Sequence, residues 1–149
     1  MNIQNVKTLK EACDDLFKIS PELLIEKMIE RTICELIIGM DYDPTFGKYI
    51  IVGGGGVFVE LLKDSTVLIL PVSREDIRKA LSNLKVFKIL EGFRGRVKGD
   101  IEAVIDSVMS VIELISTNEV EELDINPLLV LKESDGVVAA DTLIKLYSG

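Results

Sequence analysis

Acidic and amide side chains near the C-terminus are the residues best suited to chemistry. Asp124 and Asn126 lie two positions apart in an apolar run typical of a β-strand, so both side chains are expected on one face of a sheet. Asp141 follows beyond a predicted hairpin and joins that face if the hairpin loop is even-numbered, or the other face if it is odd-numbered. Two carboxylates and an amide oxygen suit Mg²⁺. The same pattern also fits a polar sheet face that meets only solvent.

A run of four glycines between two predicted strands is the second candidate site. Gly53, Gly54, Gly55 and Gly56 allow positive φ and close approach of the backbone, so they can present bare amides to an anion. No Gly-Lys-Ser/Thr follows, which excludes a P-loop. The alternative interpretation is a flexible hairpin tip or a bulge.

Isolated charged side chains supply further candidates. Arg94 and Arg96 lie in a glycine-flanked loop, where their guanidinium groups can bind phosphate oxygens in a bidentate way or can be ordinary surface charges. Glu26, Glu35 and Glu60 each interrupt an apolar predicted strand. Such a residue usually lies on a solvated face, although it can also reach a nucleotide or a metal.

Composition narrows the functional classes. The chain has 149 residues, 48% hydrophobic and 5% aromatic, which predicts a single domain over 1–149 with an aliphatic core. A net charge of −8 disfavours nucleic acid and anionic membranes as partners. The absence of His excludes a histidine relay and a phosphohistidine on this chain. Cys13 and Cys34 are expected to be buried reduced thiols, and with no signal peptide or membrane-length run indicated, the expected location is cytoplasmic.

Helices and strands alternate along the chain. One helix is predicted from a capping box at Thr8 and Glu11 to the Ser20-Pro21 stop, a second from Ser73 and a third from Asp100. The first two predicted strands are expected to form an antiparallel pair. The predicted strands are 22–29, 33–40, 48–52, 57–62, 66–70, 120–130 with a bend at Pro127, and 137–144. The sequence therefore predicts an α+β fold, with about three helices packed on a mainly antiparallel sheet.

Three stretches occur in an order that resembles a known family. They are ELIIGMDYDPTFGKYIIVGGGGVFVELLKD, LPVSREDIRKALSNLKVFKILEGFRGR and ELDINPLLVLKESDGVVAADTLIKL. Together they resemble the C-terminal subdomain of the ATP-grasp domain in ADP-forming acyl-CoA synthetases, relatives of the succinyl-CoA synthetase β subunit. The resemblance covers residues 6–146, nearly the whole chain.

The resemblance implies a Mg²⁺-nucleotide site. That family converts acyl-CoA, ADP and phosphate to the free acid, CoA and ATP. The metal ligands it implies are Asp124, Asn126 and Asp141. The nucleotide-binding residues it implies are Glu26 in a hinge strand, Gly53, Gly54, Gly55, Gly56, Glu60 and Arg94. No catalytic residue is assigned.

The sequence also departs from the family pattern. The family's other half, with its glycine-rich loop and phosphate-binding lysines, has no counterpart here, and neither have the CoA-binding and phosphohistidine domains. Phosphoryl transfer needs charge neutralised from several sides, so the chain is expected to be inactive alone and to work with a partner subunit or domain. The alternatives are a non-catalytic regulatory or interaction module, as in acetyltransferase fusions, or an unrelated α+β protein.

Overall fold

The computed structural model describes residues 3–56 and 63–147. Its contacts group the chain into two units, Met1–Glu30 and Arg31–Gly149. In the first unit, helix α1 spans Val6–Leu16 and begins at Asn5, whose side chain accepts a hydrogen bond from the Thr8 amide at 2.9 Å. The capping box predicted at Thr8 and Glu11 is therefore wrong. The helix starts one turn earlier because Asn5 already satisfies a free amide.

The predicted strand at 22–29 is also wrong. This stretch of the first unit has no strand, and it borders an apolar cavity of about 550 Å³ together with α1. Strand β1 (Cys34–Asp43) pairs instead with β2 (Gly47–Gly54) and with β4 (Val120–Val130). A segment forms a strand only where another strand is available to pair with it. An apolar run in the sequence does not determine which segment that is.

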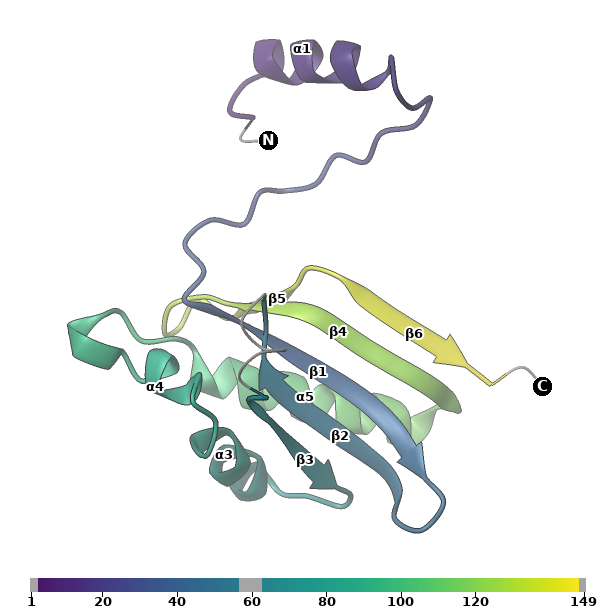
Figure 1. Ribbon diagram of the computed structural model, residues 1–149, viewed down its shortest axis with the longest axis vertical. Coiled ribbons are helices and arrows are strands. Elements are labelled where there is room, and N and C mark those ends of the chain that lie inside the picture. Colours follow the sequence, from purple (N-terminus) through teal and green to yellow (C-terminus); the bar gives the residue numbers. More distant parts are fainter. Residues whose placement is uncertain (1–2, 57–62, 148–149) are drawn as a thin grey trace. The chain divides into compact units, whose positions relative to one another are not determined.

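An antiparallel sheet forms the centre of the second unit (Figure 1). Its order is β3-β2-β1-β4-β5, and β6 also pairs with β4. The remaining strands are β3 (Ser65–Ile69), β5 (Val137–Ala139) and β6 (Thr142–Leu146). The strand predicted over 137–144 is thus two strands, which pair with successive parts of β4 and break at Ala140-Asp141. The predicted strand 57–62 lies outside the described residues.

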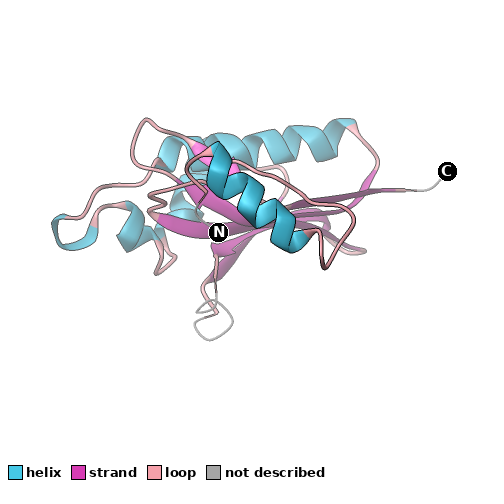
Figure 2. Ribbon diagram, turned by 90° about the horizontal axis from the view of Figure 1, so that it is seen from above, coloured by secondary structure: helices cyan, strands magenta, loops and turns pink. Residues whose placement is uncertain are grey.

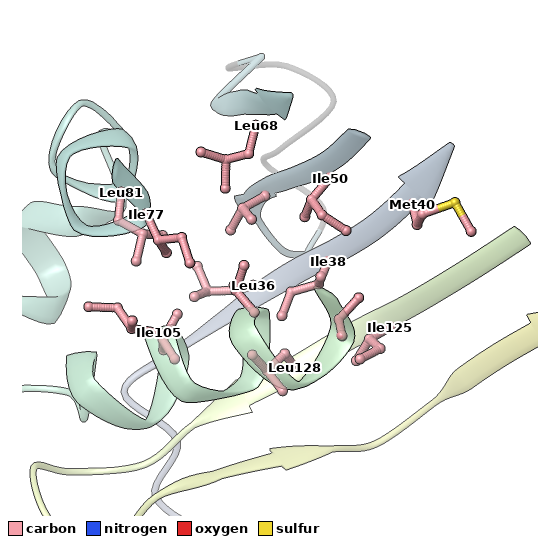
Figure 3. Packing of buried hydrophobic residues seen from close by; sticks show 14 of the residues in the cluster. Leu36, Ile38, Met40, Ile50, Leu68, Ile77, Leu81, Ile105, Ile125 and Leu128 are labelled. Carbon is pink, nitrogen blue, oxygen red and sulfur yellow. The ribbon is translucent and has the colours of Figure 1, made fainter. Parts of the chain in front are cut away.

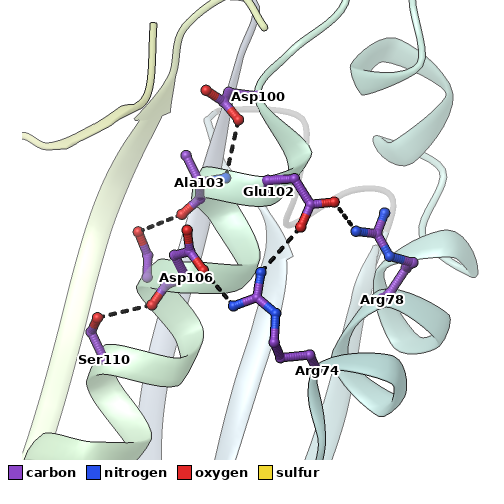
Figure 4. A network of polar contacts seen from close by, with 8 residues as sticks. Arg74, Arg78, Asp100, Glu102, Ala103, Asp106 and Ser110 are labelled. Atoms are coloured by element: carbon purple, nitrogen blue, oxygen red, sulfur yellow. Dashed lines mark hydrogen bonds and ion pairs between the residues drawn. The ribbon is translucent and has the colours of Figure 1, made fainter. Parts of the chain in front are cut away.

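The helices of the second unit begin where the sequence predicts caps. Helix α3 (Arg74–Ser82) starts at a capping box formed by Ser73 and Asp76, and α5 (Ile101–Thr117) starts at Asp100. Arg74 and Arg78 of α3 form ion pairs with acidic residues of α5 (Figure 4). Between these helices lie α4 (Phe87–Leu90) and the 3-10 turn η1 (Phe93–Gly95).

One face of the sheet carries the hydrophobic core. Helix α5 runs along this face (Figures 1 and 2), and the buried side chains of β1, β2 and β4 meet those of α3 and α5 between the layers (Figure 3). Leu36 and Ile38 of β1 are fully buried, whereas Ile37 between them is only half-buried. This alternation is the period-2 pattern of a strand covered on one side. The α+β fold with a mainly antiparallel sheet is confirmed.

The structure also bears on the two cysteines and on the expectation of no membrane-length run. Cys13 and Cys34 are free thiols, half-buried rather than buried as expected. Burial, with a smaller contribution from the charge of Glu35, raises the pKa of Cys34 to about 12. Among the described residues, no helix has both the length and the apolar character needed to cross a bilayer.

Candidate functional site

The sheet face opposite the core holds a cavity of about 590 Å³. Four cross-strand neighbours, one from each of four strands, form a row across it. They are Ile51 of β2, Gly39 of β1, Asp124 of β4 and Leu143 of β6. We call this surface the open face, because the described helices of the second unit pack on the other side of the sheet. Beside the row, the cavity is also lined by Met40, Asp41, Tyr42, Glu121, Glu122, Leu123 and Tyr147.

The structure places the three predicted metal ligands at neighbouring backbone positions of β4 and the start of β6. Leu123 and Ile125 are buried, while half-buried Asp124 and exposed Asn126 alternate with them and share the open face. The β4–β6 register, continued by one residue, brings Asp141 opposite Asn126, and the Asn126 amide donates to the Asp141 carbonyl at 3.1 Å. The β1–β4 register also shifts between Ile125 and Leu128, which identifies a bulge at the predicted Pro127 bend.

Of these three residues only Asp124 lines the cavity, and all three differ from Asp41 and Glu121, two other acids of the cavity wall, in their partners. The Tyr49 hydroxyl donates to Asp41 at 3.0 Å, and this hydrogen bond is the main reason that the pKa of Tyr49 is raised. The Lys145 ammonium donates to the Glu121 carboxylate at 2.8 Å and forms an ion pair with it. Among the described residues, by contrast, no side chain bonds to the carboxylate of Asp124 or Asp141 or to the amide of Asn126. Their oxygen atoms remain available to a ligand.

This donor set fits Mg²⁺ rather than a metal held entirely by protein. The described residues contain no group of three or more His, Cys, Asp or Glu placed to hold a metal ion. Mg²⁺ does not need one, because it commonly binds through one or two carboxylates and completes its shell with waters and phosphate oxygens. The residues therefore fit the ion on chemical grounds.

The glycine run is less open than its sequence suggests. The Gly54 amide donates to the Asp64 carbonyl at 2.9 Å, and the Gly55 amide donates to the Glu35 carbonyl at 2.6 Å. The expectation of bare amides at these two positions is therefore wrong. A Cβ on Gly55 would lie 2.9 Å from the backbone of Glu35, so that glycine is required by close packing within the protein.

A second cavity of about 440 Å³ borders the same run, between β2 and α4. Gly56 has φ of +83°, and a Cβ there would lie 3.2 Å from the Glu35 carboxylate. A carboxylate so close repels phosphate, which makes this end of the run a poor anion site on its own. Buried Asp64 accepts hydrogen bonds from the backbone amides of Lys85 and Val86 at 2.7 and 2.8 Å, and so ties α4 to the sheet.

The remaining predicted nucleotide contacts are not gathered at the open face. Arg94 lies in η1 with φ of 56°, and its guanidinium sits 5.2 Å from the centre of the Phe93 ring. It lines neither of these two cavities. Exposed Glu26 belongs to the first unit, and Glu60 lies outside the described residues.

Comparison with known proteins decides the family. The ATP-grasp domain family matches residues 1–146. This chain belongs to the ATP-grasp domain family. The β subunit of ADP-forming acetate–CoA ligase II from Pyrococcus furiosus is 36% identical over 157 residues, a match that covers 98% of this chain and 66% of the subunit. The ADP-forming acetate–CoA ligase of Methanocaldococcus jannaschii is 41% identical over 123 residues, covering 82% of this chain and 18% of that protein.

A solved structure supports the same ATP-grasp assignment. Acetyl-coenzyme A synthetase 1 from Ca. Korarchaeum cryptofilum, in complex with coenzyme A and Mg-AMPPCP, superposes with a TM-score of 0.84 at 32% identity. The match covers 99% of this chain and 67% of that chain. The present ATP-grasp chain thus spans about two-thirds of that Pyrococcus furiosus subunit and about a fifth of the single-chain ligase.

One position of the site was missed by the sequence argument. Gly39 lies in the middle of β1, beside Asp124, and lines the open-face cavity. An isolated glycine inside an apolar strand pattern is a recognised sign of a bulge or of a close approach by a ligand or backbone. The single glycine in the apolar predicted strand 33–40 was therefore the signal that could have indicated this position.

Proposed function

We propose that this chain forms the Mg²⁺-nucleotide half-site of an ADP-forming acid–CoA ligase. The reaction of the whole enzyme would convert acyl-CoA, ADP and phosphate to acid, CoA and ATP. The observation that carries the proposal is the set of unpartnered oxygen donors from Asp124, Asn126 and Asp141, gathered at an open sheet face in a chain of the ATP-grasp family.

In this proposal the three side chains hold Mg²⁺, and the ion neutralises charge on the nucleotide's phosphates. Asp124 and Asp141 contribute carboxylate oxygens, and Asn126 contributes its amide oxygen. Of the glycine run, Gly56 is the position left for a phosphate contact, since Gly53 is paired on both sides within the sheet and the amides of Gly54 and Gly55 are already bonded. Because the Glu35 carboxylate lies close to Gly56, such a contact would depend on the charge of the bound Mg²⁺. Glu26, Glu60 and Arg94 remain proposed nucleotide contacts.

The proposal includes a partner. Phosphate-binding lysines and a CoA-binding, phosphohistidine-bearing domain would come from another subunit or domain, because this chain has no His.

Calorimetric titration with ADP, with and without Mg²⁺, tests the proposal. We expect saturable binding that requires Mg²⁺ and that is lost in Asp141→Ala. The titration is repeated on a fusion that joins the unmatched part of the Pyrococcus furiosus subunit to this chain. We expect the fusion to bind ADP more tightly, because the half of the ATP-grasp site that carries the phosphate-binding lysines is then present. No binding by either protein would contradict the proposal and favour a regulatory module without nucleotide.

A further inference from the structure

The row across the open face has one position without a side chain. Ile51, Gly39, Asp124 and Leu143 are successive cross-strand partners, and all four line the same cavity. Side chains on opposed positions of neighbouring strands normally stand next to one another. The row therefore has a notch at Gly39, directly between the Ile51 side chain and the Asp124 carboxylate.

Neither packing among the described residues nor backbone conformation explains this glycine. A Cβ on Gly39 would lie 3.7 Å from Asp124 Oδ1, 3.9 Å from the Leu123 carbonyl oxygen and 4.0 Å from Ile51 Cβ, which are ordinary contact distances. Gly39 is also absent from the glycines with positive φ. Gly55 differs, because a Cβ there would meet backbone at 2.9 Å.

A glycine inside a strand weakens the strand, so some other feature must favour it at position 39. We take that feature to be the space left by the missing side chain. The notch opens into the cavity and borders the Asp124 carboxylate, which has no partner among the described residues. A glycine that leaves room beside a ligand-binding group is a common means of letting a ligand approach the backbone closely.

We infer that Gly39 is a positioning residue that leaves room beside Asp124 for the coordination shell of a Mg²⁺-bound nucleotide phosphate. The inference rests on the proposed function and adds a residue to the same site. Mg²⁺ holds its waters and phosphate oxygens at about 2.0–2.1 Å in a nearly octahedral shell. A branched side chain in the notch would occupy the place of one such ligand, while leaving all three proposed protein ligands intact.

Mn²⁺ bound with ADP, followed by electron paramagnetic resonance, measures this directly. We compare the wild-type chain with Gly39→Val, and with Val67→Leu as the control. Val67 pairs with Ile51 in the same row but does not line the cavity. We expect Gly39→Val to weaken Mn²⁺-ADP binding by about tenfold or more, because the shell no longer fits. Val67→Leu should bind as the wild type does.

A folding control keeps the test decisive. Gly39→Val should melt cooperatively, because valine favours strands and the backbone there is unstrained. If it does not, Gly39→Ala replaces it in the test, because a methyl group fits there at ordinary contact distances. We then expect the affinity for Mn²⁺-ADP to fall by about threefold. Unchanged affinity in the folded variant overturns the inference.

The outcomes separate the inference from the proposed function. Binding by the wild type, loss in Asn126→Ala and no loss in Gly39→Val would leave the Mg²⁺-nucleotide site standing and overturn the role of Gly39 alone. Failure of the wild type and of the fusion to bind Mn²⁺-ADP would contradict the proposed function, and the inference with it.

Discussion

The two faces of strand β4 differ in what holds their side chains. Leu123 and Ile125 face the helices and are nearly fully buried. Asp124 and Asn126 alternate with them on the open face, where no described side chain bonds to them. One strand thus carries a face whose residues are determined by packing and a face whose residues are not needed for packing. Residues of the second kind are the ones to assign to a ligand.

The same contrast distinguishes the glycines. Gly55 is needed because the Glu35 backbone lies where its side chain would be, whereas Gly39 has room for a methyl group. A glycine therefore indicates a ligand only when the surrounding protein does not already require it. On this criterion we propose the site on the open face of β1 and β4, while the middle of the glycine run is required by packing.

Substitutions on the two faces of β1 should give the largest difference. Ile38 is fully buried, so Ile38→Ala should lower the free energy of unfolding by about 2–5 kcal/mol through lost contacts and a cavity. Ile37→Ala, at the half-buried neighbour on the open face, should cost clearly less. Urea denaturation followed by circular dichroism measures both. Equal losses would mean that the open face is packed as tightly as the core.

The two glycines allow a second comparison. Gly55→Val must displace the Glu35 backbone, so we expect it to lower the free energy of unfolding by about 1–3 kcal/mol. Gly39→Val should not destabilise the protein to a similar extent. Thermal melts of the two variants at equal concentration check this. A wild-type melting temperature for Gly55→Val would show that the run is free to move and would reopen its role as an anion loop.

Asp64 tests how α4 is held against the sheet. Its carboxylate accepts two backbone amides, and Asp64→Asn keeps only one acceptor oxygen. We expect a loss of about 1–2 kcal/mol in urea denaturation, because one buried amide is left without its acceptor. Asp141→Asn, at an exposed carboxylate with no partner among the described residues, is the matched control and should leave stability unchanged.

A smaller effect is expected for the ion pairs between α3 and α5 (Figure 4). Arg74 reaches both Glu102 and Asp106, but all three side chains are about half exposed or more. Exposed ion pairs contribute little and are screened by salt. Arg74→Gln should lower the melting temperature slightly at low ionic strength. The difference should vanish in about 1 M NaCl, and its persistence there would show that the pairs are not screened.

The capping box of α3 should give a small, pH-dependent effect. The Ser73 hydroxyl and amide donate to Asp76, and these bonds hold the pKa of Asp76 below its ordinary value of 3.8. Because the pKa of Asp76 is lower in the folded state, its carboxylate stabilises the fold at pH values above 3.8. This stabilisation is lost as the pH falls through the folded-state pKa. The stability difference between wild type and Asp76→Asn should therefore shrink at acidic pH. A constant difference would contradict the bond to the carboxylate.

Local signals in the sequence predicted much of this fold. Ser73 and Asp100 were predicted as helix caps and are confirmed, because capping depends on residues within one turn. The segment 22–29 was predicted as a strand and is not one, because strand formation depends on partners far along the chain. The break at Ala140-Asp141 was missed for the same reason: it is set by how β5 and β6 divide β4 between them.

The candidate site was predicted in part. The spacing of Asp124 and Asn126 is enough to place them on one face of a strand, whereas the position of Asp141 depended on a hairpin whose parity the sequence left open. The bonded amides of Gly54 and Gly55 could not be foreseen, because their acceptors are the carbonyls of Asp64 and Glu35. The role proposed for Gly39 emerged only from its cross-strand neighbours.

The most direct test of the open-face site is paramagnetic broadening of amide signals by Mn²⁺-ADP, in a ¹⁵N-labelled sample of the chain. The account predicts that broadening begins with the amides of Gly39, Asp124, Asn126 and Asp141, and reaches α3 and α5 only at higher metal concentration. Broadening that begins at α3 or α5, or at Gly54 and Gly55 while Asp124 stays sharp, would contradict it.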